Sequence, residues 1–189
     1  MRCPCVQQHQ GHDHPRNRMM PKPKPLPTAE RVRQMFDYDT ATGQLRWKES
    51  PSPNVKIGAT AGSISGSGYT YVSVDRQSYR AHRIIWLWIT GEDPGADLID
   101  HRDGDRLNNR FANLRRASYS QNNANYKKPR SNTSGYKGVS WSPSHKKWAA
   151  NIRWQGKLRW LGRFDTPEHA HAAYLKAAAE LFGEFARAA

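Results

Sequence analysis

A polar segment near the middle of the chain carries the residue types that hydrolysis at phosphate requires. Residues 100–125 hold three aspartates, one histidine and several asparagines around an Asp-Gly-Asp turn. Asp100 and an asparagine side-chain oxygen are hard ligands, which suit Mg²⁺ or Mn²⁺ better than a thiolate-preferring metal. His101 can act as a general base near neutral pH. Base, metal and phosphate are the minimal parts of phosphodiester hydrolysis, although Asp and Asn are also ordinary turn and cap residues.

Length and charge narrow the class of protein. The chain has 189 residues, enough for one ordinary domain or two small ones. Lys and Arg number 30 against 16 Asp and Glu, so the net charge of +14 favours a polyanionic partner, with nucleic acid ahead of an anionic membrane surface. The longest apolar run, Ile84–Ile89, is too short to span a bilayer. With only Cys3 and Cys5 and no apolar leader, a cytoplasmic protein of a bacterial or phage-infected cell is expected.

Composition divides the chain into four segments. Residues 1–27 are predicted to be a disordered tail, because they are polar and their MMPKPKPLP stretch alternates Pro and Lys and cannot pack a core. The cysteines and histidines of this tail are potential zinc ligands, but their irregular spacing favours an unstructured leader. Residues 28–126 are expected to form one domain, 127–135 a linker and 136–189 a second domain, with an α+β fold.

Hydrophobic periodicity predicts the elements of the first domain. Those expected before residue 97 are a helix over Thr28–Phe36, a strand after the Thr42-Gly43 turn, a strand over Tyr69–Val74, a turn over Asp75–Ser78 and a helix over Ala81–Thr90. In the polar segment, Leu98–His101 is predicted to enter the turn as a strand and Leu107–Asn109 to return from it. Residues 111–125 are then expected to be helical, with Phe111 and Leu114 turned inward.

The C-terminal part is predicted to be three strands followed by a helix. The strands are Tyr136–Trp141, Lys147–Trp154 and Lys157–Phe164, with a tight Gln155-Gly156 turn between the last two. Thr166 as N-cap and Pro167 at the first helical position are a strong helix start, and Gly183 is expected to end this helix.

This part is also strongly basic. Residues 127–164 contain ten Lys or Arg and no Asp or Glu, with four tryptophans interleaved. On the second strand, Lys147, Ala149, Asn151 and Arg153 share one face, while Trp148, Ala150, Ile152 and Trp154 share the other. The second set is the expected core, and the first is free to meet DNA. The alternative is a solvated basic face, which the absence of any compensating acid disfavours.

Short motifs in the first domain occur in the order of a known family. They are His82-Arg83, Asp100-His101-Arg102-Asp103-Gly104-Asp105, Asn108-Asn109-Arg110, Asn113-Leu114-Arg115 and Gln121-Asn122. Together with the upstream segments DYDTATGQLRWK and GYTYVSVDRQSYRAHR, they resemble the HNH endonucleases of phages and mobile introns over residues 30–126. The resemblance implies a small ββα-metal (His-Me finger) domain.

The resemblance also implies roles for individual residues. His101 is the general base that activates water, and Asp100 and Asn122 hold one divalent metal, Mg²⁺ first and Mn²⁺ second. Asn113 holds the loop together by hydrogen bonds. Many HNH enzymes have histidine where this chain has Asn122, and asparagine resembles the intron-homing branch. For His82, a structural histidine at a helix N-terminus and a phosphate contact are both open.

The basic C-terminal part resembles the AP2 DNA-binding domain over residues 135–185. The matching segments are Tyr136-Lys137-Gly138-Val139, Lys147–Arg153, Trp160-Leu161-Gly162, Phe164-Asp165-Thr166, Glu168-His169-Ala170 and Ala173-Tyr174. The AP2 family lays a three-stranded antiparallel sheet, backed by one helix, in the major groove. Carried over by position, Lys137, Asn151, Arg153 and Trp160 face DNA, and Lys147 joins them from the strand pattern.

The sequence therefore predicts a two-domain, metal-dependent endonuclease of phage or homing type that acts on double-stranded DNA and not at a membrane. The resemblance suggests products with a 3′-hydroxyl and a 5′-phosphate. A monomer would nick one strand, whereas a double-strand break needs a dimer or two events. Two alternatives remain: a DNA-binding regulator that keeps the HNH scaffold without catalysis, and a protein that binds or cleaves RNA.

Overall fold

The computed structural model describes residues 24–127 and 131–187, which form a mixed α and β structure. The cysteines and histidines of the predicted tail lie outside these residues. Within the described chain there are four small antiparallel sheets, and the last is the predicted three-stranded sheet near the C-terminus. No helix in residues 24–127 or 131–187 is long and apolar enough to cross a membrane.

The first helix, α1 (Ala29–Met35), begins as predicted, because the side chain of Thr28 accepts a hydrogen bond from the backbone N–H of Arg31. It leads directly into a hairpin of β1 (Phe36–Asp39) and β2 (Gln44–Trp47). The sequence prediction contained only the second of these strands. β1 is four residues long and half acidic, which gives it a weak strand signal on its own.

The next sheet contains β3 (Ser63–Ile64), β4 (Thr70–Val74) and β5 (Gln77–Arg80) in that order. The turn was predicted over Asp75–Ser78, but it occupies only Asp75 and Arg76, with φ angles of 48° and 64°. Two consecutive residues with positive φ form the tight turn that matches strand twist, and β5, which was not predicted, follows directly at Gln77.

The polar segment contains two strands and a helix. The helix α2 (Ala81–Thr90) precedes them and ends at Gly91, which has a φ of 75°. β6 (Leu98–His101) then pairs with β7 (Leu114–Ala117), and α3 (Tyr119–Asn125) comes next. The predicted entry strand is confirmed, with His101 opposite Leu114 in the ladder.

The predicted return strand over Leu107–Asn109 is wrong. These residues lie in a loop, where the backbone N–H of Leu107 bonds to the Asp105 carboxylate and replaces a ladder bond. The predicted continuous helix over 111–125 is also wrong. It is a 3₁₀ turn η1 (Phe111–Asn113), the strand β7 and then α3, which starts late because Ser118 and Gln121 form a capping box.

The C-terminal sheet has the order β10-β9-β8 and is backed by one helix, as predicted. Its elements are β8 (Val139–Ser142), β9 (Lys147–Trp154), β10 (Lys157–Phe164), α4 (Pro167–Phe182) and the 3₁₀ turn η2 (Gly183–Phe185). β8 starts three residues later than expected, because the carbonyl of Tyr136 accepts bonds from the side chains of Asn132 and Ser134 instead of a strand.

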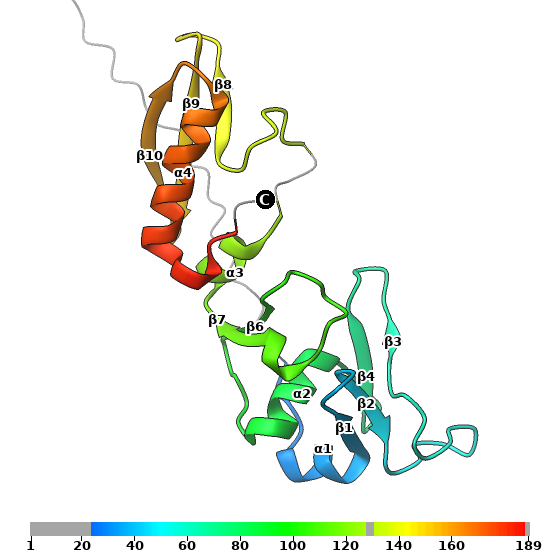
Figure 1. Ribbon diagram of the computed structural model, residues 1–189. Helices are drawn as coiled ribbons and strands as arrows, with labels where there is room; N and C mark the ends of the chain where they lie inside the picture. Colours follow the sequence, from blue (N-terminus) through cyan, green and yellow to red (C-terminus); the bar gives the residue numbers. More distant parts are fainter. Residues whose placement is uncertain (1–23, 128–130, 188–189) are drawn as a thin grey trace, which may run out of the picture.

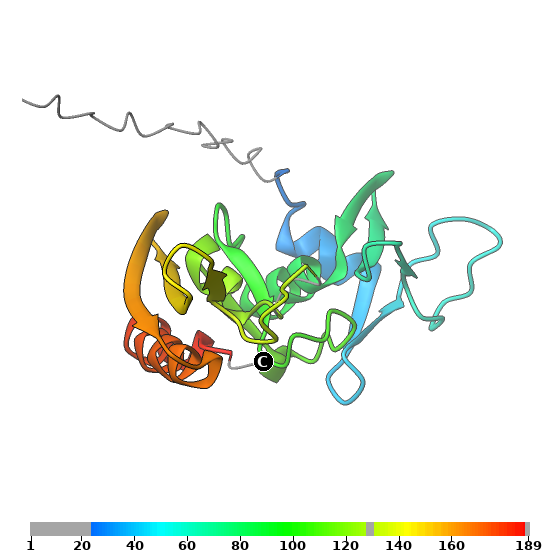
Figure 2. The same cartoon turned by 90° about the horizontal axis from the view of Figure 1, so that it is seen from above.

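Three hydrophobic clusters hold these elements together. The largest fills the N-terminal part between α1, α2 and the first hairpins, and a small one lies between the C-terminal sheet and α4. The third, here called the shared cluster, joins Ala117 of β7 and Ala124 of α3 to C-terminal residues. Those residues are Ile152, Tyr174, Ala178, Phe182 and Phe185. α3 therefore lies beside the end of α4 (Figure 1), and the polar segment lies between the two ends of the molecule (Figure 2). The predicted domain boundaries remain a prediction.

Truncation of one buried isoleucine tests the contribution of the largest hydrophobic cluster to stability. Ile84 of α2 is fully buried, whereas Ile57 is 70% exposed. We expect Ile84→Ala to lower the free energy of unfolding by about 2–5 kcal/mol through lost burial and a residual cavity. Ile57→Ala should stay within about 0.5 kcal/mol of the parent. Chemical denaturation of both variants measures the difference, and equal stabilities would contradict this packing.

Candidate active site

His101, the last residue of β6, is buried and held by one side-chain hydrogen bond. Its Nε2 lies 3.0 Å from the Oδ1 of Asn109, which is also buried. An amide oxygen only accepts, so we assign the imidazole hydrogen to Nε2 and the lone pair to Nδ1. The Asn109 loop is fixed in turn by Tyr38, whose hydroxyl donates to the carbonyl of Asn109 and accepts from the N–H of Phe111.

Asp100 precedes His101 and is the most constrained carboxylate of the segment. Its Oδ2 accepts a hydrogen bond of 3.0 Å from Nε of Arg115, the residue opposite it on β7. The Nη2 of Arg115 lies 3.0 Å from the same oxygen, and both side chains are buried. Asn125 at the end of α3 donates from Nδ2 to both carboxylate oxygens and to the carbonyl of His101. A buried charge requires such partners, so the strand pair and the helix are joined at this carboxylate.

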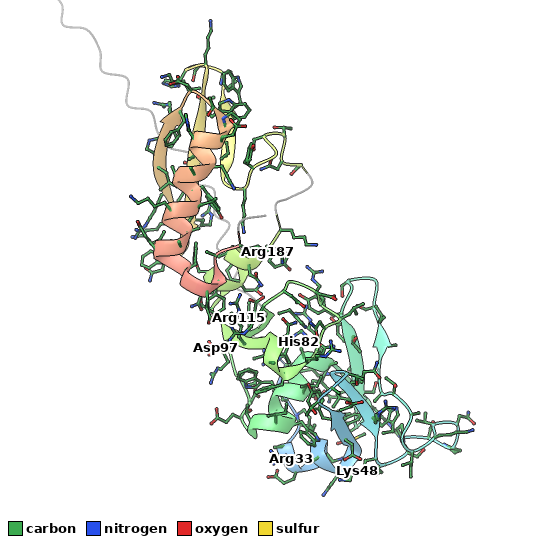
Figure 3. All side chains as sticks on the ribbon, in the orientation of Figure 1. Arg33, Lys48, His82, Asp97, Arg115 and Arg187 are labelled. Carbon is green, nitrogen blue, oxygen red and sulfur yellow. The ribbon has the colours of Figure 1, made fainter. Side chains whose placement is uncertain are left out.

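The C-terminal turn η2 also reaches this ion pair. Arg115 donates from Nη1 to the carbonyl of Glu184, and its guanidinium lies 3.7 Å from the ring centroid of Phe185. Arg187 donates to the carbonyl of Asp103 in the loop after β6. Figure 3 shows Arg115 and Arg187 where the N-terminal and C-terminal parts of the chain meet. The candidate site is therefore supported by residues from both the N-terminal and the C-terminal parts of the chain.

Asn122 lies one helical turn before Asn125 and is half-buried. Its side chain makes no hydrogen bond to another residue of the described chain. It lines a cavity of about 190 Å³ together with Asp100, His101 and Asn125. The structure thus brings the predicted metal ligands Asp100 and Asn122 to one cavity with the predicted base.

The side chain of Asn113, at the end of η1, makes three hydrogen bonds to two residues of the loop between β6 and β7. Its Nδ2 donates to the carboxylate of Asp103 and to the carbonyl of Asn108, and its Oδ1 accepts from the N–H of Asp103. It does not line the cavity beside His101. Its contacts are those of a residue that fixes the loop.

His82, near the start of α2, is buried with its ring perpendicular to that of His101 and 5.0 Å away. Burial is the main cause that lowers the pKa of His82 well below its usual value, so its imidazole is neutral at physiological pH. A neutral, buried ring is the state expected of a structural histidine. His82 also borders a second cavity, which lies beside the candidate site.

Lys137, expected to face DNA, lies against α3. Its Nζ donates to the carbonyl of Tyr126 at 2.7 Å and to that of Ala124, which are unpaired carbonyls at the C-terminal end of the helix. Burial, with a smaller contribution from Arg187, lowers the pKa of Lys137 to about 8. A DNA contact for Lys137 stays a prediction, while its observed bonds hold the helix that carries Asn122 and Asn125.

The other expected DNA-facing residues lie on the C-terminal sheet. Trp160 is 53% exposed on β10, and Arg153 is exposed on β9 with Nη1 bonded to the carbonyl of Gly156. Lys147 forms an exposed ion pair with Asp165. Asn151 is half-buried and borders a hollow shared with α3 and α4. These side chains are not gathered at the candidate active site.

Three residues of the site were missed by the sequence reasoning. Asn109, Arg115 and Asn125 are buried polar residues, each bonded to Asp100 or His101. Asn109 and Arg115 belong to the motifs that carry the family resemblance, but no role was predicted for either residue. A correct assignment of β7 would have placed Arg115 opposite Asp100 in the strand pair.

Comparison with known proteins gives two family matches. A model described as HNH endonuclease matches residues 79–124, and a model described as AP2 domain matches residues 134–184. Protein 3.8 of Escherichia phage T7 is 38% identical over 115 residues, which are 59% of this chain and 94% of that protein.

This chain contains an HNH endonuclease domain and an AP2 domain. Another relative, from Acanthamoeba polyphaga mimivirus, is named an uncharacterized HNH endonuclease and is 37% identical over 124 residues. That match covers 65% of this chain and 63% of the relative. No solved structure matches the chain. The HNH match contains both residues of the Asp100–Arg115 pair. It also contains the residues that line the cavity around His101, apart from Tyr69 and those after residue 124.

Adjacent arginines on β7 give a matched test of the buried pair in this HNH domain. The side chain of Arg115 is 6% exposed, whereas that of Arg116, paired with Asp97 at 2.8 Å, is 45% exposed. We expect Arg115→Ala to lower the free energy of unfolding by about 3–5 kcal/mol, since Asp100 is left buried without its partner.

Arg116→Ala should cost about 1 kcal/mol or less, because solvent screens an exposed pair. Urea denaturation of the two variants gives the comparison. Equal losses of stability would show that the Asp100–Arg115 pair is not the buried interaction described above.

Proposed function

We propose that this protein is a divalent-metal-dependent DNA endonuclease and that its AP2 domain binds duplex DNA. The observation that carries the proposal is the placement of His101 in one cavity with Asp100 and Asn122, with its Nε2 directed at Asn109. The family match supports a nuclease, and relatives in two viruses support a phage or homing-type setting.

In the proposed reaction, His101 is the general base. Its Nδ1 accepts a proton from water while the water oxygen forms a bond to phosphorus. The bond from phosphorus to the 3′ oxygen breaks, and that oxygen takes a proton from solvent, which leaves a 3′-hydroxyl and a 5′-phosphate. Asn109 keeps the imidazole in the required tautomer and orientation throughout.

The donor set fits a hard divalent cation. Asp100 offers a carboxylate oxygen, Oδ1, whose only hydrogen bond within the described chain is from Asn125, because Arg115 bonds to Oδ2. Asn122 offers an amide oxygen from the wall of the same cavity. We propose that these two residues hold Mg²⁺ or, alternatively, Mn²⁺. A bound ion would polarise the phosphoryl oxygen and stabilise the leaving oxyanion.

A plasmid assay tests the nuclease and its base together. We expect the full chain to convert supercoiled DNA to nicked or linear DNA with Mg²⁺ and to lose this activity in EDTA. His101→Ala should reduce the rate by roughly 10²- to 10⁴-fold, the usual contribution of a general base. His169→Ala, at an exposed position of α4, is the matched control and should cleave normally.

Tight binding without cleavage in both Mg²⁺ and Mn²⁺ would instead support the non-catalytic regulator. Cleavage that survives in the His101→Ala variant would show that the base is assigned to the wrong residue. Competition by duplex RNA in the same assay separates an RNA-directed protein from a DNA-directed one.

The salt dependence of binding tests the role of the basic sheet. If Arg153 neutralises a phosphate, Arg153→Gln should reduce the slope of log K against log salt concentration by about 0.9 for duplex DNA. Lys176→Gln, an equal change of charge on the exposed side of α4, should leave the slope unchanged. Binding titrations in EDTA measure both variants without cleavage, and identical slopes for both would remove Arg153 from the interface.

A further inference from the structure

Two arginines lie against the ring of one tyrosine beside the active-site cavity. The guanidinium carbons of Arg80 and Arg106 lie 4.6 and 4.7 Å from the ring centroid of Tyr69. The same ring lies 6.2 Å from that of His101. We call Arg80, Tyr69 and Arg106 the arginine clamp. It brings β5, the start of β4 and the loop after β6 together next to the proposed base.

The clamp borders a groove next to the active-site cavity. A cavity of about 560 Å³ is lined by all three clamp residues and by Asn122. Tyr69, Arg106 and Asn122 also line the cavity that contains Asp100 and His101. Because the two cavities share these lining residues, a ligand in the groove is adjacent to the proposed metal ligand Asn122.

The positive charge of the clamp is uncompensated within the described chain. Arg80 and Arg106 have no carboxylate within ion-pair distance there, whereas neighbouring arginines have partners. Those partners are Asp93 for Arg83, Glu184 for Arg102, Asp100 for Arg115 and Asp97 for Arg116. No Asp or Glu lines the groove. Burial raises the pKa of the Tyr69 phenol, so its hydroxyl stays neutral and supplies no negative charge.

The guanidinium groups are held before any ligand binds. Arg106 donates from Nη1 to the carbonyl of Ser67 at 2.8 Å and from Nη2 to the hydroxyl of Tyr126 at 2.9 Å. Arg80 donates from Nε to the hydroxyl of Tyr71. A guanidinium has five N–H donors, so each arginine keeps donors for an anion. Preorganised groups lose less conformational entropy on binding.

We propose that Arg80 and Arg106 bind a backbone phosphate of the DNA strand next to the scissile phosphate, with Tyr69 as the platform that holds them. Arginine recognises phosphate because its planar donors match two phosphate oxygens. The ligand is a DNA phosphate because the groove lies next to the site where the proposed nuclease cuts, and this inference rests on that proposed function. The clamp would set the position of the strand relative to His101.

Single-phosphate neutralisation tests the clamp. A duplex selected for binding from a random pool is prepared with one neutral methylphosphonate at each position in turn. Wild type, Arg106→Gln and Arg106→Lys are compared with Arg76→Gln, a matched control in the β4–β5 turn at the other end of the hairpin. Binding is measured in EDTA and cleavage in Mg²⁺, and thermal unfolding confirms that each variant is folded.

For wild type, one methylphosphonate beside the cut should weaken binding and raise KM, and Arg106→Gln should do the same by roughly 10- to 100-fold, the usual loss of a charged hydrogen bond. In Arg106→Gln that methylphosphonate should have little further effect, while other positions behave as in wild type. Arg106→Lys should recover part of the affinity, and Arg76→Gln should match wild type.

Two results would overturn the clamp: unchanged binding and kinetics in a folded Arg106→Gln variant, or losses that add at every phosphate. The two proposals are separable in the same experiment. A protein that shows the expected phosphate pattern but never cleaves refutes the nuclease and retains the clamp as a DNA-binding site. Cleavage without the pattern refutes the clamp alone.

Discussion

The buried ion pair between Asp100 and Arg115 is the interaction on which the rest of the site depends. Antiparallel pairing of β6 and β7 places the two residues opposite each other, and Asn125 brings α3 to the same carboxylate. Removing either charge would leave the other desolvated and unpaired, so the strand pair, the helix and the turn η2 must be positioned together. The position of His101, one residue along β6, follows from this constraint.

Charge is distributed unevenly around that pair. The arginines near the junction with the C-terminal part are bonded to carboxylates or carbonyls, whereas Arg80 and Arg106 are held by a ring, two hydroxyls and a carbonyl. The first group stabilises the protein by neutralising internal charge, and the second leaves positive potential at an open groove. A net charge of +14 alone does not distinguish these two uses of arginine.

The sequence predicted best the elements that local chemistry determines. The helix that begins next to Thr28, the helix over Ala81–Thr90, the Gln155-Gly156 turn and the Thr166–Pro167 helix start are all found, since each depends on nearby residues. It failed at β7, where four residues become a strand only because β6 lies beside them, and a helix was predicted instead. The partners of Asp100 were missed for the same reason. Strand register and the packing of η2 against Arg115 depend on residues that are far apart in the sequence. Asp100, His101 and Asn122 were predicted from their motif, and the structure brings them to one cavity.

The shared cluster has a geometric consequence for the proposed enzyme. Phe182 and Phe185 pack with Ala117 and Ala124, and Lys137 bonds to the carbonyl end of α3, so the C-terminal sheet is attached to the helix that carries Asn122. The offset in base pairs between a sequence bound by that sheet and the cut is then set by side-chain packing. A change in the size of these packed residues would then shift the cut along the duplex.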